Sequence, residues 1–172
     1  MSRRRGVFLV ALLFTVVLSY ALWPEPTLDE VLKADNVIVF KGQRRLLLLH
    51  GDKTLKVYTV ALGREPHGHK IREGDGRTPE GTYRLDARNP RSRFHLALHI
   101  SYPNESDRAR AVAAAASPGG DIMIHGLPNG LGWIGRLHRL VDWTDGCIAV
   151  TNREMEEIWR AVDDGTPIEI RP

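Results

Sequence analysis

Alternation of apolar and polar residues predicts short β-strands along the middle of the chain. The first three ranges are 37–40, 45–50 and 55–62, and glycine-containing connections separate them. These connections are too short for the crossover that parallel neighbours need. We therefore expect an antiparallel meander at the start of a mostly β domain.

Four later ranges also predict strands, at 94–100, 122–124, 148–150 and 167–170. The first of them alternates cleanly and places one set of apolar side chains on a face that we expect in the core: Phe94, Leu96, Leu98 and Ile100. Its other face carries His95 and His99, which either line a groove or meet solvent.

Helices are predicted at only two places. Range 105–116 is rich in alanine and follows Asn104, a possible N-cap. A stronger helix is expected after Asn152, with Gly165 as its stop and a buried stripe at helical spacing: Met155, Ile158, Trp159 and Val162. Residues 63–81 are rich in Gly, Pro and charge and predict a long exposed loop, which is typical of a functional or mobile segment.

The N-terminal pattern differs from the rest of the chain. Three arginines at 3–5 precede an uncharged apolar run from Val7 to Trp23, the layout of a secretory signal or a short membrane anchor. We predict a signal peptide or anchor at 1–23, a linker or short helix at 24–35 and one domain at 36–172. The domain is then exported, to the periplasm or the outer face of the inner membrane.

Charge argues against a nucleic-acid partner. The chain has 24 Lys and Arg against 21 Asp and Glu, and the three N-terminal arginines account for the whole excess. The exported body is therefore neutral overall, and no nucleic-acid recognition motif is present.

Cys147 is the single cysteine of the chain, so no internal disulfide can form. It follows Gly146 in a turn of small residues that leads into an apolar strand, where a thiol can be presented as a nucleophile and the turn amides can hold an oxyanion. A thiol needs a neighbouring base, and His125 at the end of strand 122–124 is the best candidate. The alternative is that Cys147 is simply a small buried apolar residue.

His125-Gly126, sixteen residues between Leu127 and Thr144, and then Thr144-Asp145-Gly146-Cys147 resemble the motif of the L,D-transpeptidases with a YkuD-type catalytic domain. Residues 74–83, with Thr-Pro-Glu-Gly, are similar to a turn and strand of that family. Runs 89–95 and 117–121 resemble its YafK-like branch, so the likeness extends over roughly residues 36–171.

The resemblance implies a mostly β fold, a β-sandwich or partly open barrel with one or two short helices. It also implies acyl transfer on peptidoglycan stem peptides through a Cys147 thioester, with His125 as proton donor and acceptor and no cofactor. The expected supporting residues are Gly146 as the oxyanion turn, Gly126, Thr144 and Asp145, and the candidates for the substrate groove are His99, Trp133 and His138.

Three alternatives to transfer stay open: a hydrolase, an inactive wall-binding module and a thiol peptidase that acts on ordinary L-peptides, against which the resemblance speaks. Water as the acceptor would make the protein a hydrolase of the same bonds, which releases a wall-attached lipoprotein or acts as an L,D-carboxypeptidase. Asp145 stands where the family usually has His, and it either orients a histidine or meets a cationic substrate group, or only caps its turn. The replacement of His by Asp145 also leaves open an inactive wall-binding module. His67 and His69 invite a metal interpretation, but no partner stands at a telling spacing and we predict no metal site.

Overall fold

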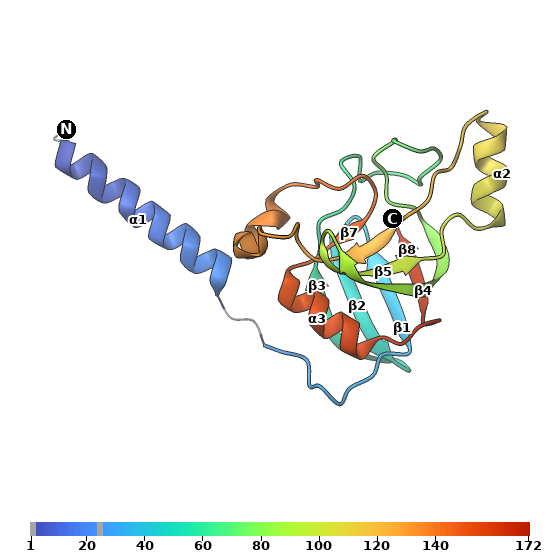
Figure 1. Cartoon of the computed structure of the whole chain (residues 1–172), viewed down its shortest axis with the longest axis horizontal. Helices are drawn as coiled ribbons and strands as arrows, with labels where there is room; N and C mark the ends of the chain where they lie inside the picture. The colour runs from blue at the N-terminus through green and yellow to red at the C-terminus, as the bar shows by residue number, and fades with distance from the viewer. Residues whose placement is uncertain (1–2, 24–25) are drawn as a thin grey trace.

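The computed structural model describes residues 3–23 and 26–172, in which a curled β-sheet carries a few short helices (Figure 1). The helices are α1 (Arg3–Leu22), α2 (Glu105–Ala113), the 3-10 helix η1 (Gly132–Leu140) and α3 (Asn152–Ala161). The strands are β1 (Asn36–Phe40), β2 (Arg45–His50), β3 (Lys53–Thr59), β4 (Gly81–Ser92), β5 (His95–Ile100), β6 (Met123–His125), β7 (Ile148–Ala149) and β8 (Pro167–Arg171).

The eight strands form one sheet in the order β3-β2-β1-β8-β4-β5-β6-β7. The predicted meander is confirmed, because β1, β2 and β3 pair antiparallel in chain order. The segment after β3 then pairs with the far edge of the sheet, where Ala61 bonds to Ala149 in both directions at 2.8 and 3.0 Å. This contact curls the sheet into a partial barrel and holds the segment around Cys147 between two neighbours.

The core lies inside this curl and against α3. Val37, Leu48, Leu98 and Ile124 are fully buried there, as is Met155 of α3. The predicted stripe of α3 is largely confirmed, but its cap is not: Thr151, not Asn152, is the N-cap, because its hydroxyl and Glu154 form a reciprocal capping box. The helix ends at Ala161, before the expected stop at Gly165, since Val162 is already extended.

Strand β4 is the main element that the alternation pattern missed. It is twelve residues long and contains Pro90, and most of its side chains are charged or exposed. It is nevertheless held on both sides, by β5 and by β8. Phe94 was wrongly expected in the core: Ser92 pairs with His95, so Phe94 lies at the tip of the β4–β5 hairpin.

Helix α1 projects from the domain, and only its C-terminal end lies beside η1 (Figure 1). In the described parts of the chain, no helix combines the length and apolar character needed to cross a bilayer. The signal or anchor at residues 1–23 stays a prediction, and residues 1–2 of it are outside the described part. Residues 26–35 form a turn and extended coil without a helix.

Candidate active site

Cys147 and His125 come together because β6 and β7 are parallel neighbours. Ile124 pairs with Ile148 and His125 with Ala149, so Cys147 lies one position before β7, beside Met123. Paired residues of adjacent strands point to the same face, and positions two apart share that face. The side chains of Cys147 and His125 are therefore diagonal neighbours on one face, and both line one cavity of about 420 Å³.

The His125 imidazole is buried and held in one orientation. Its Nδ1 donates to the Gly126 carbonyl oxygen at 2.7 Å, which leaves Nε2 as the atom available to accept a proton. The rings of Phe94 and Trp143 pack against it, with centroids 4.5 and 5.7 Å away. Burial lowers the pKa of His125, so the ring is neutral at neutral pH.

Gly126 is required where it lies. A Cβ on this residue would lie 2.8 Å from Asn152 Oδ1 and 3.1 Å from the Phe94 carbonyl oxygen. The Gly126 amide bonds to that same carbonyl oxygen at 3.1 Å. The lack of a side chain thus allows the close packing that fixes the acceptor of the His125 Nδ1 proton.

The Cys147 thiol is protonated in this environment. Burial raises its pKa to about 11, with the negative charges of Asp145 and Asp121 adding to the effect. The Met123 amide and the positive charge of Lys70 act in the opposite direction. The thiol donates to the Asp121 carbonyl oxygen at 3.5 Å. The site therefore holds a neutral thiol beside a neutral imidazole, not a resting ion pair.

The turn before Cys147 is stabilised by hydrogen bonds within the turn, and it packs closely against the 63–81 loop. Thr144 Oγ1 accepts from the Gly146 amide at 3.1 Å and donates to the Cys147 carbonyl oxygen at 2.7 Å. Gly146 has φ +129°, and a Cβ there would lie 2.6 Å from the Arg77 carbonyl oxygen. Only glycine fits, and its amide is engaged within the turn.

The cavity gathers residues from three segments: the end of β4 with the hairpin tip, β6 with the residues before it, and the turn at 143–147. Several of them were not singled out as functional by sequence, including Phe94 and Trp143, whose signal was limited to the run 89–95 and to tryptophan content. The full lining is Asn89, Arg91, Ser92, Arg93, Phe94, Asp121, Met123, His125, Trp143, Thr144, Asp145 and Cys147.

Asp145 lines the mouth of the cavity with an exposed carboxylate. It forms an ion pair with Arg64, from the segment that follows β3. The carboxylate of Asp145 therefore already has a cationic partner next to the cavity that it lines.

The three predicted groove residues are not among those that line the cavity. His99 pairs with Asp86 through Nδ1 at 2.6 Å. Trp133 is 63% exposed on η1. His138 is buried on η1, and neither of its ring nitrogens has a hydrogen-bond partner among the described residues. Burial, together with smaller effects of the nearby Arg139 and His125 side chains, lowers the pKa of His138 to about 4.

Both ring nitrogens of His69 are engaged in contacts that stabilise the 63–81 loop. Its Nδ1 accepts from the Glu80 amide at 3.0 Å, and its Nε2 lies 3.0 Å from Asp107 Oδ1. Within the described residues, no group of three or more His, Cys, Asp or Glu could hold a metal ion.

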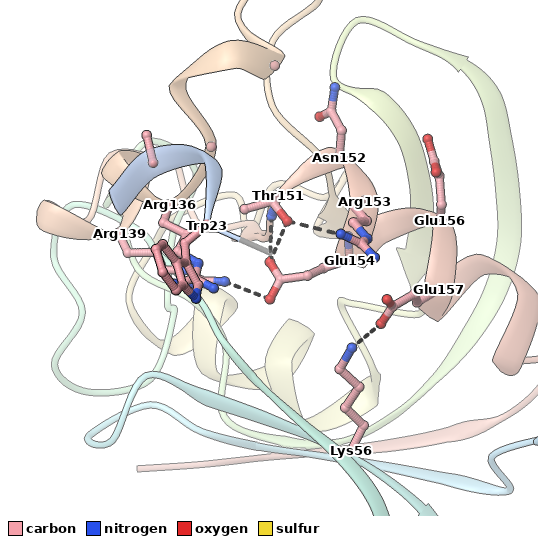
Figure 2. Close-up of a pocket in the computed structure, with 13 residues that line it drawn as sticks. Trp23, Lys56, Arg136, Arg139, Thr151, Asn152, Arg153, Glu154, Glu156 and Glu157 are labelled. Atoms are coloured by element: carbon pink, nitrogen blue, oxygen red, sulfur yellow. Dashed lines mark hydrogen bonds and ion pairs between the residues drawn. The ribbon is translucent and has the colours of Figure 1, made fainter. Parts of the chain in front are cut away.

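A second hollow, of about 370 Å³, lies between η1 and α3 and contains neither Cys147 nor His125 (Figure 2). Its charges largely neutralise one another. Arg139 bonds to Glu154 at 2.6 Å, and Lys56 pairs with Glu157. This hollow is lined by paired charges and shares no lining residue with the cavity of Cys147 and His125.

Comparison with known proteins places this geometry in context. The model of the YkuD family, the L,D-transpeptidase catalytic domain, matches residues 34–170. The YafK protein of Escherichia coli (strain K12), named provisionally as an L,D-transpeptidase, is 33% identical over 97 residues, which are 55% of this chain and 32% of that protein. The matched region thus spans about a third of the curated relative.

Two solved structures are also similar. Pgp2, the helical cell shape determining protein of Campylobacter jejuni, has a TM-score of 0.60 and 28% identity, over 78% of this chain and 46% of that one. An L,D-transpeptidase of Xylanimonas cellulosilytica has a TM-score of 0.53 over 86% of this chain and 64% of that one. Its identity is 14%, so this second likeness concerns the fold alone.

Proposed function

Because the chain belongs to the L,D-transpeptidase family with a YkuD catalytic domain, we propose that it performs acyl transfer on peptidoglycan stem peptides through a thioester on Cys147. The observation that carries this proposal is the shared cavity, in which the Cys147 thiol and the His125 imidazole are diagonal neighbours. The Nδ1 bond to Gly126 supports His125 as the base, because it presents the unprotonated Nε2.

The first half-reaction starts from the neutral pair. Cys147 Sγ attacks the carbonyl carbon of the donor while its proton passes to His125 Nε2, so no free thiolate has to accumulate. Since the Gly146 amide is bonded to Thr144, we assign the developing oxyanion to the Cys147 amide. The C–N bond then breaks, and the departing amine takes the proton from His125.

The second half-reaction regenerates the thiol. An acceptor amine gives its proton to His125 and attacks the thioester, which forms a new amide as the C–S bond breaks. The departing sulfur of Cys147 takes the proton back from His125. Water in the same role would yield a free acid, so the identity of the product distinguishes transfer from hydrolysis, including release of a wall-attached lipoprotein. Stem peptides lie outside the cytoplasmic membrane, and we therefore propose that residues 1–23 direct export and that the domain acts in the periplasm.

Mass spectrometry of the full-length protein after exposure to muropeptides or a carbapenem tests this function. We expect an adduct on Cys147 and its loss in Cys147→Ala. His125→Ala should acylate about a thousandfold more slowly, since general base catalysis contributes about 10²–10⁴-fold. His50→Ala, which changes an exposed histidine paired with Asp35, is the matched control and should acylate normally.

Two outcomes would contradict the proposal. A normal adduct rate in His125→Ala would remove His125 from the mechanism. Retention on peptidoglycan sacculi that persists in Cys147→Ala, with no product from the unaltered protein, would instead indicate a wall-binding module.

A further inference from the structure

Two arginines whose guanidinium groups have no partner among the described residues line the cavity of Cys147 and His125, which Asp121 and Asp145 also line. Arg91 and Arg93 both line it with exposed side chains. Within the described part of the chain, neither guanidinium has a hydrogen-bond or ion-pair partner. Arg64 at the rim, by contrast, is already paired with Asp145. A pair of free guanidinium groups facing a cavity is suited to an anionic group of the ligand.

The backbone that carries these arginines is fixed. The Asn129 amide donates to the Arg93 carbonyl oxygen at 2.9 Å, and the Asn129 side chain donates to the Ser92 carbonyl oxygen at 3.1 Å. The Arg91 amide donates to Asn89 Oδ1 at 3.0 Å. The hairpin tip is thus a preorganised platform, which lowers the entropic cost of binding.

The same tip is attached directly to the reacting groups. Arg93 precedes Phe94, whose ring packs on His125 and whose carbonyl oxygen bonds to the Gly126 amide. The Arg93 backbone therefore lies one residue from a side chain in contact with the base. Since Arg93 lines the same cavity as Cys147 and His125, a ligand group bound by Arg93 lies in the cavity that contains the proposed reacting groups.

We propose that Arg91 and Arg93 are specificity-determining residues that bind a free carboxylate of the acyl-donor peptide. This inference rests on the proposed function, because it concerns the donor of that reaction. The carboxylate takes no part in bond making: it fixes the donor so that the scissile carbonyl faces Cys147, and the two guanidinium groups compensate its charge. A stem peptide offers such a group at its C-terminus and on its diamino-acid side chain.

The test compares donor peptides that differ by one amide. The full-length protein is given a stem peptide acid, its C-terminal amide and its side-chain amide, and kcat/KM is measured for unaltered, R91Q, R93Q and double-variant protein. The double variant should lose about a hundredfold on the acid, mainly through KM, if each charged hydrogen bond contributes about tenfold. On one of the two amides the loss should shrink to about twofold, and that amide identifies the recognised carboxylate.

Arg108→Gln is the matched control, because it removes one exposed arginine of α2 outside the cavity. Alkylation of Cys147 by the neutral reagent iodoacetamide should be equal in all variants and so report an intact site. Unchanged kcat/KM in the double variant, or an equal loss on the acid and both amides, overturns the proposal. If the unaltered protein turns over no peptide, the proposed function fails; binding of the same peptides to Cys147→Ala, measured by calorimetry with and without R91Q/R93Q, still decides the carboxylate site.

Discussion

The protonation of single residues governs how this site can work. Cys147 has a pKa raised to about 11 and His125 a lowered pKa, and burial is the leading cause of both. Burial disfavours the charged form of either group, so the burial that keeps the thiol protonated also keeps the imidazole able to accept its proton. Activation therefore depends on the bound substrate and not on a standing thiolate.

This assignment predicts the pH dependence of two different reactions. Alkylation of Cys147 by iodoacetamide should rise about tenfold per pH unit until pH approaches 11, because the thiolate fraction increases with pH below the pKa. Turnover of a donor peptide should instead stay high down to mildly acidic pH and fall only below the ordinary imidazole pKa of about 6.5, where His125 becomes protonated. Alkylation that is already maximal at pH 7 would show that the resting form is an ion pair.

At the scale of elements, the loop at 63–81 supports the turn at 143–147, which carries Cys147. The Lys41 ammonium is almost fully buried and donates to three oxygens of this loop: the Gly68 carbonyl at 2.6 Å, the Thr78 carbonyl at 2.7 Å and Glu80 Oε1 at 2.8 Å. The loop in turn lies against Gly146 through the Arg77 carbonyl oxygen. The composition of the 63–81 loop is typical of a mobile segment, but the buried Lys41 side chain holds the loop in place.

Replacement of Lys41 by Met should show this support directly. The substitution leaves Glu80 and two carbonyl oxygens without their buried partner, so we expect unfolding in urea to become easier by about 3 kcal/mol, as for breaking a buried ion pair. Donor-peptide turnover should fall together with this stability, because the 63–81 loop no longer holds the turn that carries Cys147 in place. Lys53→Met, at an exposed position of β3, is the control, and equal stability of the two variants would refute the role of Lys41.

At the scale of the whole molecule, the catalytic domain depends little on the N-terminal helix. The contacts of α1 with the domain lie at its C-terminal end, where Ala21 approaches Gly135 and Arg136 lies over the Tyr20 ring at 6.0 Å. The coil at residues 26–35, by contrast, contributes both a core side chain and a backbone hydrogen bond to the domain. Leu28 is buried in the core, and the Ala34 amide bonds to the Ala161 carbonyl oxygen at 2.8 Å.

Two truncations should separate these contributions. A chain that begins at Pro26 should melt within about 4 °C of the full-length protein. Among the described side chains that it loses, Ala21 is buried, but Ala21 lies outside the hydrophobic core cluster. A chain that begins at Asn36 removes Leu28 and the Ala34 bond, and it should melt at a clearly lower temperature in calorimetry. Equal melting of all three chains would show that residues 26–35 contribute nothing to stability.

The sequence alone determined the local features of this protein. Alternation located the meander, because strand period is encoded by near neighbours. The motif of His125-Gly126 and Thr144 to Cys147 indicated the family by resemblance and named the pair that we propose as reacting groups. The tertiary structure decided what surrounds that pair. The pairing of Ala61 with Ala149 curls the sheet, and the β4–β5 hairpin carries Phe94 and the two free arginines to the cavity. These contacts join segments far apart in the chain, and packing, not local pattern, selects them.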